Sequence, residues 1–335
     1  MKKFFLALSV LAMLIFAAVP SHALLSMPDA VPGQDILLPF FLSAITSGES
    51  TLLVVQEVHG NATTLAVDVY DIDSTSRHDT TETMSGYDVE AWNVRDDWIA
   101  SASPTDREAL KIDLDGDGVN DHYAGYVKLV NASADANDLV AFIYQIDLSN
   151  GIASGLLAVS EEYENTAVAL ADGMVDATFI ELFNADALAA AQMRLVQLAP
   201  TTPLAFAKYP RYFVYNSDGT NYIFSWRSDG TNVTAHFDFY NEIEKAYSGN
   251  ITITHELDII DVMDIIPSGH TGSYPIGGWI KWKYPGKKGA GFNATSATRE
   301  WLMYSYQQVA AASAGANWNI IFEAHTEAFT TSAAY

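Results

Sequence analysis

Short runs of β-branched and aromatic residues, separated by Gly, Asn and Asp, recur along most of this sequence, and they limit it to a fold built from strands. The runs Thr51–Val58 and Thr64–Tyr70 are joined by His59-Gly60-Asn61-Ala62, which predicts a β-hairpin. The runs His122–Val130 and Asp138–Leu148 predict a second pair of strands of the same kind. The run 35–43 is broken by Pro39, which is typical of a first or edge strand.

The segment 211–240 carries the strongest local turn signal. Ser217-Asp218-Gly219-Thr220-Asn221 recurs eleven residues later as Ser228-Asp229-Gly230-Thr231-Asn232. Asp-Gly between alternating strands favours a tight turn, because that turn requires positive φ values. We therefore predict a three-stranded meander over 211–240. Its alternating residues would share faces, and they are Tyr222, Phe224 and Trp226 in one strand and Val233, Ala235, Phe237 and Phe239 in the next.

Helix signals are few. Asn184 can cap an Ala-rich helix over 185–198, with Pro200 just beyond its end, and Ser103 can open a single turn at 104–108. The pattern predicts a mainly β fold, an antiparallel β-sandwich or sandwiches with one short Ala-rich helix. We expect an N-terminal β-sandwich domain over 24–168 and a C-terminal β-rich domain over 169–335, and one continuous domain fits the pattern almost as well.

The first 23 residues have the form of a secretory signal peptide. Two lysines precede an apolar run of about 15 residues, and Pro20-Ser21-His22-Ala23 follows the run. We expect cleavage after Ala23 and a secreted, cell-surface or periplasmic location, and we expect no membrane span in the mature chain. An uncleaved N-terminal anchor is the alternative.

Cysteine is absent, which excludes disulfides, thiolate catalysis and Cys-ligated metals. The signal peptide holds two of the 17 basic residues and none of the 41 acidic ones, so the mature chain has a net formal charge of −26. Such a charge argues against nucleic acid and anionic membranes as partners, and it favours binding of cations.

One acidic motif has a clear chemical meaning. Residues 113–121 read D-x-D-G-D-G-x-x-D, in which carboxylates two residues apart are followed by Gly118. A sharp turn there would aim the carboxylates inward, and Ca²⁺ takes six to eight oxygens. We predict a structural calcium site in this loop. Its ligands would be Asp113, Asp115, Asp117, the main-chain carbonyl of Val119, and Asp121 directly or through water.

The loop departs from an EF-hand, because position 12 is Ala124 and a strand follows in place of a helix. It resembles the strand-adjacent calcium loops of integrin-type β-propeller repeats and related extracellular modules. This resemblance implies calcium at the positions just named, and it does not imply a propeller fold. The alternative is an acidic Asp-Gly turn that holds no metal.

A second candidate site is the cationic, aromatic segment 277–289, which contains half of the mature chain's eight lysines. Strand alternation would place Trp279, Lys281 and Lys283 on one face, and Ile280, Trp282 and Tyr284 on the other. One interpretation is an edge strand protected by lysine. The other is an interaction surface that meets acidic groups on a second copy or a partner, or that stacks on sugar rings. Its residues would be Trp279, Lys281, Lys283, Lys287 and Lys288.

Catalytic motifs do not emerge from the sequence. His255-Glu256 is not followed by a histidine at 259, so there is no zincin motif. Gly151–Gly155 has its serine one position too late for a nucleophile elbow. We therefore expect a protein that is not an enzyme, with a hydrolase site assembled in space as one alternative.

Several short motifs together resemble uncharacterised exported β-rich proteins of Gram-negative bacteria. They are the Ile36–Phe41 strand, the predicted hairpin over 51–70, Tyr123–Tyr126, and Pro275–Trp279. The resemblance spans most of the mature chain and implies an envelope or extracellular location. The sequence thus favours a non-catalytic secreted or cell-surface structural or adhesive protein, stabilised by calcium and able to assemble into filaments. The alternatives are a secreted glycan- or ligand-binding module and a secreted hydrolase.

Overall fold

Four antiparallel sheets make up the described part of the chain in the computed structural model. The described residues are 32–46, 48–131, 138–149, 151–161, 204–214, 220–227, 232–241, 246–266, 276–284, 301–309 and 318–330. Residues from Val31 onward belong to one compact unit. Within the described residues, no helix is both long enough and apolar enough to cross a membrane. The fold is mainly β, as the sequence predicted.

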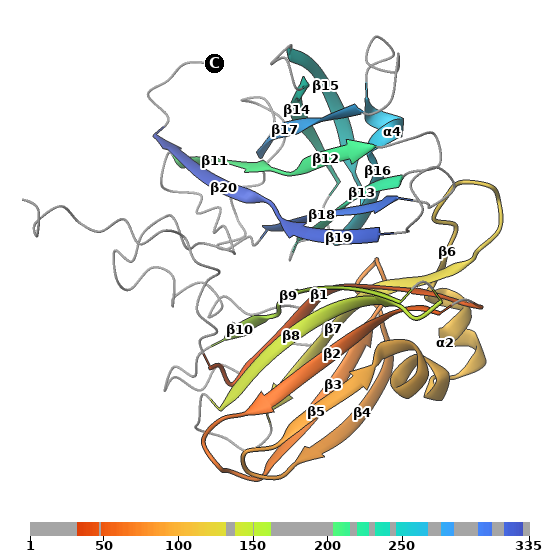
Figure 1. Cartoon of the computed structure of the whole chain (residues 1–335), viewed down its shortest axis with the longest axis vertical. Coiled ribbons are helices and arrows are strands. Elements are labelled where there is room, and N and C mark those ends of the chain that lie inside the picture. Colours follow the sequence, from red (N-terminus) through yellow and green to blue (C-terminus); the bar gives the residue numbers. More distant parts are fainter. Residues whose placement is uncertain are drawn as a thin grey trace, which may run out of the picture. The chain divides into compact units, whose positions relative to one another are not determined.

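Sheets 1 and 2 form the first sandwich (Figure 1). Sheet 1 has the strand order β5-β2-β8-β9, and sheet 2 has the order β10-β1-β7-β3-β4 with β6 paired to β7. The strands are β1 Asp35–Ala44, β2 Glu49–Glu57, β3 Thr63–Tyr70, β4 Ser76–Met84, β5 Val89–Asn93, β6 Lys111–Ile112, β7 His122–Asn131, β8 Leu139–Asp147, β9 Ile152–Leu157 and β10 Val159–Glu161. Between β5 and β6 lie three short helices, η1 Val94–Trp98, η2 Ile99–Ser101 and α2 Pro104–Ala109.

Sheets 3 and 4 form the second sandwich. Sheet 3 has the order β16-β13-β18-β19, and sheet 4 has the order β15-β14-β17-β11-β20 with β12 paired to β17. The elements are β11 Leu204–Tyr209, β12 Arg211–Val214, β13 Thr220–Arg227, β14 Val233–Asn241, β15 Ala246–Ile253, β16 Leu257–Asp261, α4 Val262–Ile265, β17 Ile276–Tyr284, β18 Trp301–Val309, β19 Trp318–Glu323 and β20 His325–Thr330.

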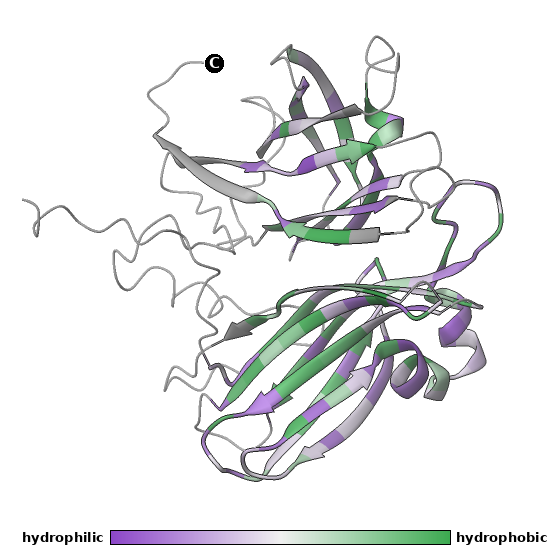
Figure 2. Ribbon diagram, viewed as in Figure 1, coloured by the Kyte–Doolittle hydropathy of each residue, from purple (hydrophilic) through white to green (hydrophobic). Residues whose placement is uncertain are grey.

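Three apolar cores hold these sheets together. The first lies between sheets 1 and 2, and the second lies between sheets 3 and 4. The third, which we call the junction core, combines residues of sheet 2, such as Phe40, with residues of sheet 3, such as Phe224. These two rings stack with their centroids 4.4 Å apart. In consequence β1 and β13 are buried on both faces, and for β1 this explains its nearly continuous apolar sequence. Figure 2 shows apolar residues along the strands of the first sandwich, whereas β4 is mostly pale or purple.

Pro39 lies at a β-bulge. The register of the β1–β7 pairing shifts between Leu38 and Phe41, so β1 holds one residue more than its partner there. The extra residue reverses the faces to which the later residues of β1 point: Leu38 packs in the first core, but Phe40 packs in the junction core. A proline, which has no N–H to donate to a ladder, fits such a position. β1 is not a simple edge strand, because it pairs with β7 on one side and with β10 at Asp35–Leu37 on the other.

The two predicted hairpins are wrong, although their strands exist. β2 pairs with β5 and β8, whereas β3 pairs with β4 and β7. β7 and β8 likewise belong to different sheets. The β2–β3 connection therefore crosses from one sheet of the sandwich to the other. Turn residues permit the chain to reverse, but they do not select the strand with which it pairs.

The meander predicted over 211–240 is wrong for the same reason. β12 and β14 both pair with β17 in sheet 4, whereas β13 pairs with β16 and β18 in sheet 3. The predicted turn at 104–108 is confirmed as α2, since Ser103 Oγ accepts the N–H of Asp106 at 3.2 Å. The Ala-rich helix predicted over 185–198 and the domain boundary at 168/169 lie outside the described residues.

Candidate calcium loop and aromatic face

The acidic loop 113–121 is anchored to sheet 2 at both ends. β6 and β7, which flank it, pair through Lys111 with Tyr123 and Ile112 with His122. The N–H of Asp121 donates to the carbonyl of Ile112 at 3.1 Å. The carbonyl of Asp121 in turn accepts the N–H of Ile45 at 2.8 Å. The loop therefore leaves and re-enters the fold at fixed positions (Figure 1).

Backbone N–H groups fold the loop around the Asp113 carboxylate. Its Oδ1 accepts the N–H of Gly116 at 2.8 Å and of Asp117 at 3.2 Å, and its Oδ2 accepts the N–H of Gly118 at 2.7 Å. Gly116 and Gly118 have φ values of +75° and +89°. A side chain at either position would strain this left-handed backbone, so glycine is required for the tight turn.

The three aspartates converge as the sequence predicted. One carboxylate oxygen each from Asp113, Asp115 and Asp117 lies within 4.8 Å of the others. Oxygens bound to one Ca²⁺ at about 2.3–2.6 Å can be no more than about 5 Å apart, so the spacing suits a single ion. Asp115 and Asp117 are exposed, and Asp113 is half-buried. These side chains could hold a hard cation with little rearrangement.

The two further predicted ligands are placed differently. Val119 donates its N–H to Asp117 Oδ1 at 2.8 Å and exposes its side chain. Asp121 lies outside the cluster of three, and its Oδ1 is 2.7 Å from Nδ1 of His122. Asp121 would thus reach an ion with its other oxygen or through a water molecule.

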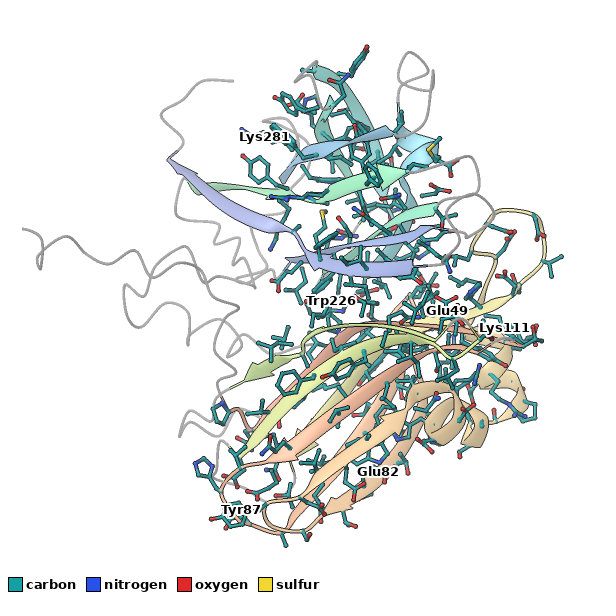
Figure 3. The ribbon with its side chains drawn as sticks, viewed as in Figure 1. Glu49, Glu82, Tyr87, Lys111, Trp226 and Lys281 are labelled. Atoms are coloured by element: carbon teal, nitrogen blue, oxygen red, sulfur yellow. The ribbon has the colours of Figure 1, made fainter. Side chains whose placement is uncertain are left out.

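Behind the loop lies a buried polar network that the sequence did not predict. His122 Nε2 lies 3.4 Å from Oε2 of Glu49, while Oε1 of Glu49 accepts the hydroxyl of Tyr306 at 2.6 Å. Glu49 is labelled in Figure 3. Burial lowers the pKa of His122, but its hydrogen bonds with Glu49 and Asp121 outweigh this effect and hold the pKa above its ordinary value. The side chain of Leu114 packs against the junction core. The acidic loop is therefore tied to both sheets that meet at that core.

The segment around Trp279 forms part of sheet 4. Ile280 and Trp282 are fully buried in the second core, whereas Trp279 and Lys281 are half-buried, so the predicted alternation is confirmed for these four residues. The edge-strand interpretation is wrong, because β17 pairs with β14 on one side and with β11 and β12 on the other. Only the backbone of Lys283 is described, and Lys287 and Lys288 lie outside the described residues.

Two tyrosines join Trp279 to form an aromatic face on sheet 4. Tyr240 of β14 stacks on Trp279 with centroids 3.9 Å apart and an interplanar angle of 11°. Tyr209 of β11 lies 5.6 Å away, and Nζ of Lys281 is 5.9 Å from the centre of the Tyr209 ring. The sequence suggested Trp279 alone because its neighbours come from strands far apart in the chain.

An Asp–His pair is the feature closest to a hydrolase site. Nδ1 of His255 is hydrogen-bonded to Oδ1 of Asp73. Ser74 follows Asp73 and has φ +59°, but its hydroxyl accepts from Tyr126 at 2.5 Å. Among the described residues, no serine or threonine hydroxyl bonds the His255 ring, so the pair lacks a positioned nucleophile.

No family model matches this chain, and comparisons with curated proteins and with solved structures found no match either.

Proposed function

We propose that this protein is an exported, non-catalytic structural or adhesive protein whose loop 113–121 binds one Ca²⁺. The observation that carries the proposal is the convergence of one oxygen each from Asp113, Asp115 and Asp117 within 4.8 Å. Export rests on the signal-peptide pattern of residues 1–23. A calcium-rich medium outside the cell suits a weak, exposed site of this kind.

The proposed role of calcium is structural. An ion would offset the repulsion among the carboxylates and fix a loop whose Leu114 side chain packs in the junction core. The loop also ends at Asp121, which bonds His122 and through it reaches Glu49. Calcium would therefore stabilise the contact between the sandwiches as well as the loop.

Self-association is the second part of the proposal. The aromatic face around Trp279 carries Lys281 in a chain whose formal net charge is −24, so it would attract acidic groups on another copy. Trp and Tyr are also the residues that most often anchor protein interfaces. A secreted glycan- or ligand-binding module is the second candidate, because the same three rings suit a sugar.

The calcium test is a melting experiment on purified protein comprising residues 24–335, in 2 mM Ca²⁺ and in EDTA. A weak site with a dissociation constant of about 0.1 mM would be stabilised by about 1.8 kcal/mol in the calcium buffer. We expect a rise in melting temperature of several degrees in the wild type. Asp115→Asn and Asp117→Asn should each abolish the rise, whereas Glu108→Gln, which removes one exposed charge outside the loop, should retain it. A wild type that melts identically in both buffers contradicts the calcium proposal.

A further inference from the structure

Tyr87 is the most exposed large apolar side chain among the described residues, and its backbone is strained. Its side chain is 74% exposed, and its φ of +60° lies in the left-handed region that non-glycine residues rarely adopt. Backbone in sparsely populated regions persists only where its surroundings enforce it, and it clusters at sites of function. Figure 3 shows Tyr87 at the outer end of the first sandwich, in the turn between β4 and β5.

A buried carboxylate enforces this conformation. Glu57, at the end of β2, is 0% exposed and accepts the N–H groups of Tyr87 at 2.6 Å, Gly60 at 2.7 Å and His59 at 2.8 Å. Burial alone would raise the pKa of Glu57, but these backbone hydrogen bonds outweigh it and keep the pKa below its ordinary value. The carboxylate is therefore ionised, and it clamps the β2–β3 connection to the β4–β5 turn.

Two glycines bring these loops into contact. A Cβ on Gly86 would lie 2.2 Å from the carbonyl oxygen of Gly60, so the two backbones touch. A Cβ on Gly60 would lie 2.6 Å from Cε2 of Tyr87 and 2.8 Å from Cζ. The edge of the Tyr87 ring thus rests on the Gly60 backbone, which holds the ring in place while most of it faces solvent.

A second buried carboxylate orients the polar neighbours of this ring. Asp138 is almost fully buried, and its Oδ1 lies 2.9 Å from Nδ1 of His59 while its Oδ2 accepts Nδ2 of Asn61 at 3.0 Å. His59 and Asn61 are themselves exposed. Two polar side chains and one aromatic ring are therefore positioned at the same loop tip by carboxylates behind them, an arrangement expected of a preorganised binding site.

We propose that this tip, residues 57–61 and 85–88, binds a neutral polysaccharide. The exposed Tyr87 ring would stack on the C–H face of a pyranose, and His59 and Asn61 would hydrogen-bond its hydroxyls. One aromatic ring among polar groups suits a ligand that is apolar on one face and polar at its edges. The tip contains no lysine or arginine, and the chain has a net formal charge of −24, so an anionic polymer is disfavoured.

This inference rests on the proposed function in one respect, namely that the protein acts through its surfaces rather than by catalysis. The glycan proposal and the calcium proposal can fail separately. A protein that does not bind glycan can still show the calcium-dependent rise in melting temperature, and a protein without that rise can still bind glycan at the tip.

The test is affinity electrophoresis of the mature protein through gels containing a β-1,3/1,4-glucan, a galactomannan, an arabinoxylan or, as the anionic comparison, alginate. We expect retardation by at least one of the three neutral glycans, and a weakening of at least about tenfold in Tyr87→Ala. Val89→Ala is the matched control, because it removes another exposed apolar side chain two residues away.

Tyr87→Gly separates binding from a role in folding. Glycine adopts φ +60° without strain, so this variant should lose glycan binding while its melting temperature stays the same or rises. Retardation by none of the neutral glycans, by alginate alone, or equally in wild type and Tyr87→Ala overturns the proposal. A lower melting temperature of Tyr87→Gly than of the wild type also overturns the proposal. An oligomer in solution that Tyr87→Ala dissociates overturns it as well, because the tip would then contact a second copy.

Discussion

Two neighbouring phenylalanines allow the contact between the sandwiches to be tested with an internal control. Phe40 and Phe41 are both almost completely buried, but they lie on opposite faces of β1. Phe41 packs in the first core, within one sandwich, and Phe40 packs in the junction core, between sheets 2 and 3. Phe40→Ala therefore perturbs the junction, and Phe41→Ala perturbs a sandwich interior with the same change of side chain.

The expected cost of Phe40→Ala follows from its burial. Replacing a buried Phe by Ala typically costs about 3–5 kcal/mol. The stack on Phe224 at 4.4 Å and the contact with Tyr304 at 5.2 Å belong to that loss, since aromatic pairs contribute about 0.5–1.5 kcal/mol beyond their buried area. Phe41→Ala should cost a similar amount. If the outer face of sheet 2 met only water, Phe40→Ala would change stability by no more than about 0.5 kcal/mol.

Urea unfolding followed by tryptophan fluorescence measures both variants, and Trp226 lies in the junction core itself. With a slope of about 3 kcal/mol per molar urea, each variant should shift the midpoint by about 1 M or more. Phe322→Ala, at an exposed aromatic position, should scarcely move it. A Phe40→Ala midpoint close to that of the wild type, alongside a strongly shifted Phe41→Ala, would refute the junction core.

Two further perturbations address buried polar groups. Tyr306→Phe removes the hydroxyl that donates to Glu49, and it should lower the free energy of unfolding in urea by about 1.5–3 kcal/mol, as expected for a hydrogen bond to a charged group. If the same loss persists undiminished in a Glu49→Gln background, the hydrogen bond to the Glu49 carboxylate is not its cause. Burial raises the pKa of Asp35 from 3.8 to about 6, so its contribution to stability is fully present below about pH 4 and is lost as the pH rises through 6. That loss is on the order of 2–3 kcal/mol at 1.36 kcal/mol per pKa unit. Asp35→Asn should therefore flatten the dependence of unfolding free energy on pH between 4 and 7. An unchanged slope would show that Asp35 does not cause this pH dependence.

Local features of this fold were predictable because neighbouring residues determine them. Ser103 caps α2 through the N–H of Asp106, and alternation along β17 separates Trp279 from Ile280, as the sequence indicated. The convergence of the acidic loop also follows from local spacing, since its glycines and its Asp113 carboxylate lie within six residues.

Sheet membership was not predictable from the same signals. The connection at 58–62 reads as a hairpin turn, yet β2 and β3 pair with strands of different sheets. Which strand becomes a neighbour depends on apolar surfaces that meet over long sequence distances, and turn chemistry holds no information about them. The nearly continuous apolar run of β1 was the available signal for a strand buried on both faces, and hence for a sheet covered on both sides.

The burial of β1 and β13 on both faces restricts where this protein can meet a ligand. A strand whose two faces lie in cores offers almost none of its side chains to a partner, so these two strands supply support rather than contacts. Within the described residues, the surfaces left for a ligand include the loops at strand ends, the outward faces of sheets 1 and 4, and the exposed side of β4. Loops held by a rigid scaffold are where binding residues concentrate. Glu49 and Glu57 show how the scaffold acts on them: each is a buried carboxylate at one end of β2, the first tied through His122 to the acidic loop and the second clamping the turn that presents Tyr87.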